Sequence, residues 1–122
     1  MKVLSFSGIT TLGPFWKLIQ EGLKDQTIRK PRKRPIQEGD RLVLYWKQRT
    51  PIHMKEVHLI GYADCIETFQ LEYRQFAYDN TIARRDGLAH SREFRAWFGF
   101  PSLHGEEIFD IIRWCLLSKG EK

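Results

Sequence analysis

Long apolar runs, cysteine pairs and clustered histidines are all missing from this sequence, and each absence argues against a class of protein. The longest apolar stretches, at residues 42–46 and 108–112, are far shorter than the ~20 residues that a membrane-spanning helix needs. The first residues also lack the long apolar segment and the cleavage site of a secretory signal peptide. We therefore expect a cytoplasmic protein that does not associate with a membrane.

The two cysteines, Cys65 and Cys115, are too few for a disulfide framework and form no CxxC pair. Each lies within an apolar stretch, where a free cysteine behaves as a small hydrophobic residue, so we expect both in the core. The four histidines do not have the spacing of zinc ligands. The sequence therefore predicts neither a metal nor a cofactor.

Positive charge is concentrated in one segment of the chain. Residues 24–55 contain ten Lys and Arg against three acidic residues, a local net charge of +7, whereas the whole chain carries +5. Such a block attracts phosphates and steers polyanions towards it. A solvated basic loop without a partner is the alternative interpretation.

The apolar pattern predicts four strands, at residues 2–7, 41–46, 57–68 and 108–117. The third is apolar on both faces, which is typical of a central strand or a barrel strand. At 122 residues the chain has the length of one ordinary domain. We expect a single domain over residues 1–118, followed by a polar tail at residues 119–122.

A helix is expected after the first strand, with Thr10 or Thr11 as its N-cap and Gly22 at its end. Its apolar stripe would consist of Leu12, Phe15, Trp16, Ile19 and Leu23.

Two more helices are expected before the last strand. One is capped by Asn80 or Thr81, and Ser91 caps the other, whose residues Phe94, Trp97 and Phe98 would form a buried face. This order of elements favours an α+β fold, a small partly open β-barrel with helices flanking it.

A short motif follows the first predicted helix. It is Gly22-Leu23-Lys24-Asp25-Gln26-Thr27-Ile28-Arg29, and after a basic loop come Glu38-Gly39-Asp40 and an apolar strand. Thr27 and Arg29 are two apart in an extended segment and so share one face, with Ile28 towards the core. Lys24 precedes them in the turn. A hydroxyl, a guanidinium and an ammonium would then converge on one surface, which suits an anionic or carbonyl-bearing ligand.

The motif resembles the signature of ASCH domains, a branch of the PUA-like superfamily with G-x-K-x-x-T-x-R after the first helix. The segment Ala83-Arg84-Arg85-Asp86-Gly87-Leu88, the helix reaching Trp97-Phe98 and the strand ending in Arg113-Trp114 are similar to the C-terminal half of these proteins. The resemblance implies a small PUA-like β-barrel with flanking helices. It covers nearly the whole chain.

The resemblance first implies RNA or nucleotide binding in a basic cleft around the motif. The expected ligand-binding residues are Lys24, Thr27, Arg29, Lys30, Arg32, Lys33, Arg34, Lys47 and Arg49. The partner would be RNA or a nucleoside or nucleotide, held through phosphate contacts.

Enzymatic activity is the alternative that the resemblance implies. Some small bacterial ASCH proteins are amidohydrolases that deacylate N4-acetylcytidine with a lysine, a threonine and a glutamate. The first two correspond to Lys24 and Thr27, and the third falls on Asp86, which is one methylene shorter. Asp86 before Gly87 is also an ordinary turn residue. Ribonuclease activity is a second alternative, although the sequence shows no dedicated histidine pair.

Overall fold

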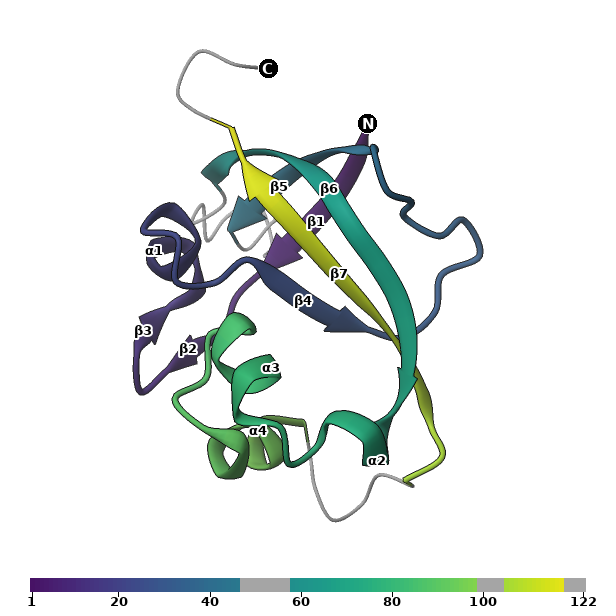
Figure 1. Ribbon diagram of the computed structural model, residues 1–122. Helices are drawn as coiled ribbons and strands as arrows, with labels where there is room; N and C mark the ends of the chain where they lie inside the picture. Colours follow the sequence, from purple (N-terminus) through teal and green to yellow (C-terminus); the bar gives the residue numbers. More distant parts are fainter. Residues whose placement is uncertain (47–57, 99–104, 118–122) are drawn as a thin grey trace, which may run out of the picture.

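Five strands form one mixed sheet that curves into a half-barrel (Figure 1). The structure, a computed structural model, describes residues 1–46, 58–98 and 105–117. The strand order is β1-β5-β6-β7-β4. The strands are β1 (Lys2–Phe6), β4 (Gln26–Arg29), β5 (Arg41–Trp46), β6 (His58–Glu72) and β7 (Ile108–Leu116). Strand β1 pairs with β5 in parallel, and the other pairs are antiparallel.

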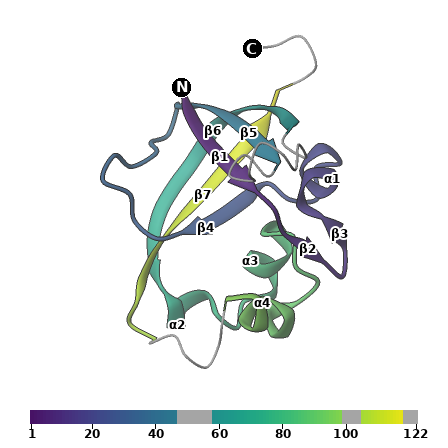
Figure 2. The same cartoon turned by 180° about the vertical axis from the view of Figure 1, so that it is seen from behind.

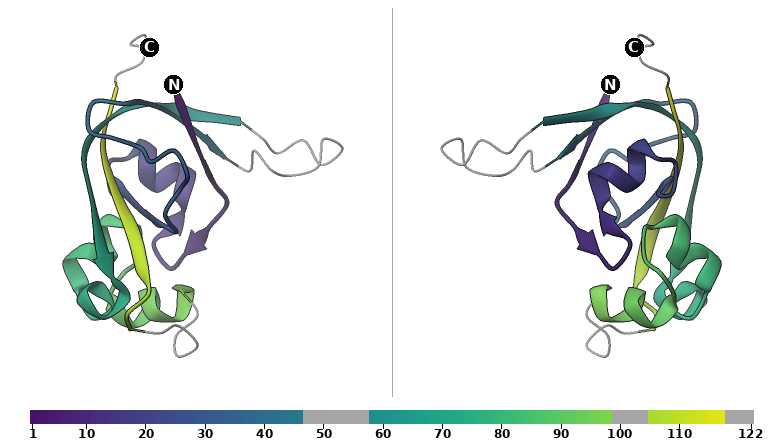
Figure 3. Two further views of the ribbon diagram at one scale, coloured as in Figure 1. Left: turned by 90° about the vertical axis from the view of Figure 1, so that its right-hand side faces the viewer. Right: turned by 90° about the vertical axis from the view of Figure 1, so that its left-hand side faces the viewer.

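The long central strand β6 gives the sheet its curvature, and the views from behind and from the side show it sweeping across the molecule (Figures 2 and 3). The register between β6 and β7 shifts between Cys65 and Glu67, and the register between β5 and β6 shifts at Leu44 and Tyr45. Such irregularities increase the local twist of a sheet. The curvature leaves β1 and β4 as the two edges of the half-barrel.

Each face of the sheet supports its own hydrophobic core. Helix α1 (Phe15–Gln20) lies within the concave side (Figure 3), where Leu18 and Ile19 pack with Leu4, Ile112 and Trp114. The second core is formed by residues from β4, β7 and the three other helices, among them Ile28, Phe76, Ile82, Phe94 and Ile111. These helices are α2 (Tyr73–Phe76), α3 (Asn80–Arg85) and α4 (Ser91–Phe98). Successive side chains of strand β4 therefore lie on opposite faces and in different environments.

The start of the first helix differs from the sequence-based expectation. Residues Ile9–Thr10 (β2) and Gly13–Pro14 (β3) form a small hairpin, and α1 begins only at Phe15 with Pro14 as its N-cap. Thr10 does not cap the helix, because its hydroxyl donates to Gly87 O at 2.7 Å. Gly13 has a φ of 130°, which a helical residue cannot have. Thr10 therefore ties the hairpin to the end of α3.

Several side chains expected in the core are instead exposed to solvent, among them Leu12, Leu23 and Cys115. Leu12 lies in the hairpin and Leu23 follows the end of α1, so neither belongs to the helical stripe. Cys115 is on the outward side of β7 next to the buried Trp114, whereas Cys65 is buried. Residues 119–122, the expected polar tail, lie outside the described residues. No helix in the described ranges is long and apolar enough to cross a membrane.

Candidate functional site between the edge strands

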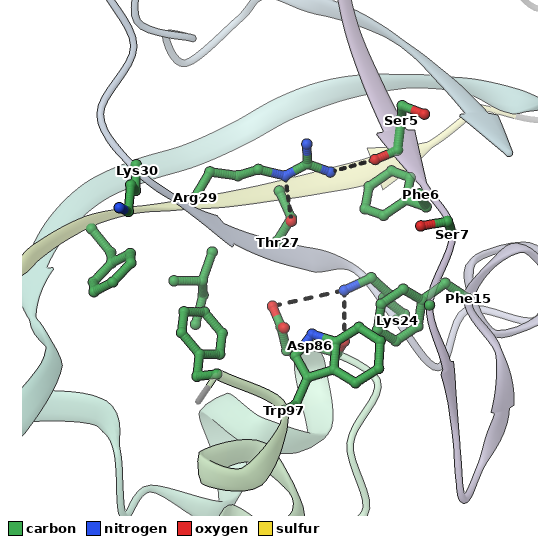
Figure 4. Close-up of a pocket in the computed structure, with 14 residues that line it drawn as sticks. Ser5, Phe6, Ser7, Phe15, Lys24, Thr27, Arg29, Lys30, Asp86 and Trp97 are labelled. Atoms are coloured by element: carbon green, nitrogen blue, oxygen red, sulfur yellow. Dashed lines mark hydrogen bonds and ion pairs between the residues drawn. The ribbon is translucent and has the colours of Figure 1, made fainter. Parts of the chain in front are cut away.

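A cavity of about 480 Å³ lies where the two edge strands, the end of α3 and helix α4 meet (Figure 4). Five of the residues singled out in the sequence line it: Lys24, Thr27, Arg29, Lys30 and Asp86. Its remaining polar lining includes Ser5 and Ser7 of the β1 segment. The tertiary structure thus brings Asp86 to the motif across an interval of 62 residues.

Backbone hydrogen bonds at two chain turns place Lys24 and Asp86 side by side. After α1, the N–H groups of Leu23 and Lys24 both donate to Leu18 O, at 2.9 and 3.1 Å, which ends the helix and turns the chain. Asp86 is the C-cap of α3. The N–H of Asp25 donates to Arg85 O at 3.1 Å and so joins the start of β4 to the end of α3.

The Lys24 side chain is almost fully buried, with an exposed fraction of 1%. Its Nζ donates to Asp86 O at 2.6 Å and to Gln26 O at 2.7 Å, and it lies 3.7 Å from Asp86 Oδ1. The ammonium is also 4.3 Å from the centre of the Phe15 ring. Two backbone carbonyls, a carboxylate and an aromatic face thus replace its hydration.

Burial dominates the acid–base properties of this pair. It lowers the pKa of Lys24 to about 8, although the Asp86 carboxylate opposes the shift and the Arg29 guanidinium reinforces it. Burial also raises the pKa of Asp86, against the attraction of Lys24 and a hydrogen bond from Gln26. Both shifts follow from the cost of holding charge away from water. With a pKa of about 8, roughly a tenth of Lys24 is a neutral amine at pH 7.

Arg29 connects the two edges of the half-barrel. Its Nη2 donates to Ser5 O on β1 at 2.8 Å, and its Nε donates to Thr27 Oγ1 at 3.1 Å (Figure 4). The guanidinium lies 5.0 Å from the centre of the Phe6 ring. Because the Thr27 hydroxyl accepts from Arg29, its own proton is free to be donated into the cavity.

Aromatic rings form the apolar walls. Phe15 and Trp97 meet edge to face with centroids 5.4 Å apart, and Phe6 packs against Phe15 at 6.4 Å. Trp97 was expected on a buried helix face, but it is 47% exposed, whereas Phe94 of the same helix is fully buried. The face of α4 that bears Trp97 turns towards the cavity, so this residue lines the site. A wall of this kind provides a surface for a flat ligand.

The other basic residues have different positions. Lys30 is exposed beside the cavity, with its Nζ 3.7 Å from Glu107 Oε1. Arg32, Lys33 and Arg34 are exposed on the loop between β4 and β5 and do not line the cavity. Lys47 and Arg49 lie outside the described residues. The positive charge of the loop is thus separate from the buried Lys24–Asp86 pair.

One buried polar residue of the site, Gln26, was not singled out from the sequence. It lies inside the motif, but alternation along β4 places it on the opposite face from Thr27 and gives no indication of a role. Its amide nevertheless reaches Asp86 Oδ1, at 3.4 Å.

The described residues offer no group of three or more His, Cys, Asp or Glu side chains that could hold a metal ion. No histidine of the described ranges lines the cavity either. The charged side chains that line the cavity are those of Lys24, Arg29, Lys30 and Asp86, and the hydroxyl groups come from Ser5, Ser7 and Thr27.

Several solved structures have a similar fold. The crystal structure of an ASCH protein from Zymomonas mobilis matches with a TM-score of 0.61 and 19% sequence identity, over 93% of this chain and 66% of that one. A serine-to-alanine variant of the Zymomonas mobilis ASCH protein matches with a TM-score of 0.55 and 20% identity, over 93% and 67% of the two chains. A tyrosine-to-phenylalanine variant matches with a TM-score of 0.59 and 16% identity, over 97% and 76%.

No protein-family model matches this sequence, and no curated protein matches it significantly. The similarity to the solved structures shows that the chain has an ASCH-like α+β fold, a mixed half-barrel with a few flanking helices. The chain spans about two thirds of the length of the Zymomonas mobilis ASCH protein that it matches.

Proposed function

We propose that the cavity binds a nucleoside or a nucleotide, either free or as one unit of a single-stranded RNA. The observation that supports this proposal is the convergence of Lys24, Thr27, Arg29 and Asp86 on one aromatic-walled cavity of about 480 Å³. Ligand pockets commonly measure ~300–1,000 Å³ and combine apolar walls with a few polar groups. A nucleobase fits this chemistry, because it has flat faces and an edge of hydrogen-bond donors and acceptors.

Each part of such a ligand has a suitable partner. The base would lie against Trp97 and Phe15, with its polar edge towards Asp86, Thr27 and Lys24. A phosphate would lie towards Lys30 and the exposed basic loop that follows it. Base stacking and phosphate contacts are the usual means by which proteins hold single-stranded nucleic acid.

Calorimetric titration tests this proposal. The ligands are the four ribonucleoside 5′-monophosphates and a mixed-sequence single-stranded RNA, at low salt. We expect one or more of them to bind, and the Asp86→Asn variant to bind at least about tenfold more weakly, because one buried carboxylate oxygen becomes a donor and the negative charge beside Lys24 is lost.

Asp64→Asn is the matched control, since Asp64 pairs with Arg41 on β5 and does not line the cavity. This variant should bind like the wild type. If the wild type binds none of the ligands, or if Asp86→Asn binds as tightly, the cavity is not the binding site that we propose.

A second candidate function is the deacylation of an N4-acylated cytidine. Lys24, with a pKa of about 8, provides an amine that is partly neutral near physiological pH, and Thr27 lines the same cavity. The neutral amine would take the proton of the Thr27 hydroxyl as its Oγ1 attacks the acyl carbon. The acyl group would pass to Thr27, the exocyclic nitrogen would leave with the proton, and water would then hydrolyse the ester.

The position of Asp86 also supports this second candidate. Although its side chain is one methylene shorter than a glutamate, its Oδ1 lies 3.7 Å from Lys24 Nζ. The carboxylate can therefore hold the lysine in place and balance its charge.

Mass spectrometry of N4-acetylcytidine incubated with the protein tests this candidate. We expect cytidine to be released by the wild type and by Lys17→Met, in which an exposed lysine of α1 is removed, but not by Lys24→Met. The rate should rise as the pH approaches about 8, because the neutral amine is the active form. If the protein binds N4-acetylcytidine but releases no cytidine, it is a binding protein for this ligand and not a hydrolase.

A further inference from the structure

A row of polar side chains crosses three neighbouring strands and ends at Asp86. Arg113 on β7 is paired in register with Glu67 on β6 and with Gln26 on β4. Arg113 Nη1 donates to Glu67 Oε1 at 2.7 Å, and Arg113 Nε donates to Gln26 Oε1 at 3.0 Å. Gln26 Nε2 in turn donates to Asp86 Oδ1 at 3.4 Å. The row leads from the half-exposed Glu67 to a buried carboxylate.

The partners of Gln26 determine the orientation of its amide. A guanidinium can only donate hydrogen bonds, so the amide oxygen must face Arg113. The amide nitrogen then faces the opposite way, where it also donates to Ile82 O at 3.1 Å. Because the Gln26 side chain is fully buried, water does not compete for these positions.

Gln26 contacts both members of the buried pair. Its side chain donates to Oδ1 of Asp86, the oxygen that lies 3.7 Å from Lys24 Nζ. Its backbone carbonyl accepts from Lys24 Nζ at 2.7 Å. A neutral residue on the helix-facing side of β4 thereby fixes where the carboxylate and the ammonium meet.

We infer that Gln26, oriented by Arg113, is a positioning residue that holds the Asp86 carboxylate in place and directs it at Lys24. This role rests on the proposed function, in which Lys24 and Asp86 face the ligand. Gln26 acts through Asp86, because its own side chain lies on the other face of β4 from Thr27 and does not line the cavity.

The charged groups around the pair come from β4, the turn before it, α3 and β7. Arg29 of β4 lowers the pKa of Lys24, and Asp25, in the turn before β4, raises it. Asp25 itself is paired with Arg85 of α3, at 2.9 Å. Arg113 of β7 reaches the pair through Gln26. A change of Gln26 to a neutral side chain leaves all these charges in place.

The test is an NMR titration of the Lys24 side chain in the ligand-free protein with ¹³C,¹⁵N-labelled lysine. In Gln26→Met the carboxylate loses a hydrogen bond that stabilises its charged form, so its hold on the ammonium weakens. We expect the pKa of Lys24 to fall below its wild-type value of about 8. In Gln26→Glu, a protonated glutamate can donate a hydrogen bond to Asp86 as Gln26 does, and an ionised glutamate adds a negative charge near Lys24. In neither case should the pKa of Lys24 fall.

Gln20→Met is the matched control. Gln20 of α1 also donates one side-chain hydrogen bond to a backbone carbonyl, Ile60 O, at 3.1 Å, but it is not in contact with the pair. Its removal should leave the pKa of Lys24 unchanged. If Gln26→Met does not fold, Gln26→Asn replaces it, since the shorter amide cannot reach Arg113 and Asp86 together, and the same fall is expected.

Two results would overturn the inference. An unchanged Lys24 pKa in the neutral variant would show that Gln26 does not act on the pair. A fall of equal size in the neutral variant and in Gln26→Glu would show that any substitution at this position disturbs the pair, and that the hydrogen bond to Asp86 is not the cause. Because no ligand is present in these titrations, their outcome is independent of whether the cavity binds a nucleoside.

Discussion

At the scale of single residues, the site depends on a lysine that is buried together with its counter-ion. Removing an ammonium from water is costly, and the two carbonyls and the carboxylate around Lys24 only partly offset that cost, since its pKa is lowered to about 8. Sites that hold perturbed groups of this kind in a cavity are candidates for function, because stability alone favours an apolar residue there.

The buried lysine makes stability depend on pH in a defined direction. The pKa of Lys24 is about 8 in the folded state, against 10.5 for a lysine in water, so between these two values the unfolded chain binds more protons. The free energy of unfolding should therefore rise with pH, by about 2 kcal/mol from this group between about pH 7.5 and about pH 9.5. Urea unfolding at the two pH values measures it.

The comparison with Lys24→Met isolates this contribution, because other groups that titrate in the same range remain in both proteins. The rise should be smaller in Lys24→Met by about the same 2 kcal/mol, and Lys17→Met should retain it. If the free energy of unfolding depends on pH equally in the wild type and in Lys24→Met, the pKa of Lys24 is not lowered by burial in the folded protein.

Gly8, where the β1 segment lines the cavity, is required because two aromatic rings approach its backbone. A Cβ atom there would overlap with Phe15 Cε2 and would lie 2.7 Å from Trp97 Cη2. Phe15 is buried and cannot move aside, so Gly8→Ala should lower the free energy of unfolding by about 1–3 kcal/mol through overpacking. Chemical denaturation measures the loss, and ligand titration should show weakened binding in parallel.

Gly61→Ala provides the comparison for this prediction. At that position a Cβ atom would meet only the flexible end of Leu116, at 3.2 Å. Its effect on stability should be clearly smaller than that of Gly8→Ala, and ligand binding should not change. Equal losses for the two variants would argue against a specific role of the Phe15 and Trp97 contacts.

At the scale of elements, short pieces of structure determine where the functional groups lie. Helix α3 has only six residues, and its C-cap is Asp86. Isolated helices of this length are unstable, so caps and packing must hold it. At its other end, Asp79 is the N-cap and accepts from Ile82 N at 3.0 Å. Thus Asp79 helps to define the position of Asp86 through the helix between them.

Asp79→Ala removes this cap and should cost about 1 kcal/mol of stability, the usual effect of losing a side-chain acceptor at an N-cap. Thermal or urea unfolding measures the loss. Asp79→Asn is the matched control, because asparagine caps helices about as well as aspartate. If both variants lose the same stability, the charge of Asp79 matters rather than its hydrogen bond to Ile82.

At the scale of the whole molecule, the half-barrel separates two kinds of positive charge. Lys24 lies in the interior against Asp86, whereas Arg32, Lys33 and Arg34 extend into solvent from the loop between the edge strand β4 and β5. The first kind suits recognition of one chemical group. The second suits attraction of a phosphate backbone, which is long-range and weakened by salt.

Replacing Arg32, Lys33 and Arg34 together by Gln should therefore weaken RNA binding most at low salt. Each phosphate contact on a single strand adds about 0.7 to the slope of log affinity against log salt, so the slope should become shallower by up to about 2. Titrations at several salt concentrations measure it. Binding of a free nucleoside, which has no phosphate, should not change.

A triple variant with the same change in net charge controls for nonspecific attraction. Lys17, Arg84 and Arg92 are exposed and lie on other elements, so their replacement by Gln should leave the slope closer to that of the wild type. If the two triple variants have equal slopes, the loop has no special role and only the total charge matters.

Much of the fold follows from local sequence patterns. The strands at residues 41–46 and 108–117 were predicted within a residue or so, and the central position of β6 followed from its two apolar faces. Gly22 lies just beyond α1 with a φ of 79°, as its place at the end of a helical stripe suggested. Such features depend on residues that are close together in the sequence, so they can be predicted from one sequence alone.

The hairpin before α1 could not be predicted in the same way. Thr10 and Thr11 are good helix caps by local preference, but in the structure they bond to Gly87 and to Glu93, which are distant in the sequence. Local helix preferences differ by less than about 1 kcal/mol per residue, so tertiary contacts of this kind override them, and no periodicity indicates such contacts. The position of Trp97 was not predictable for a similar reason, because its neighbours Phe15 and Gly8 are distant in the sequence.

By itself, the sequence determined the motif, the shared face of Thr27 and Arg29, and the concentration of positive charge in one segment. Only the tertiary structure decided that Lys24 is buried, that Asp86 is its partner, and that Gln26 contacts both. The physical reason is that spacing along a strand is a local property, whereas the desolvation that shifts a pKa depends on every element packed around the group.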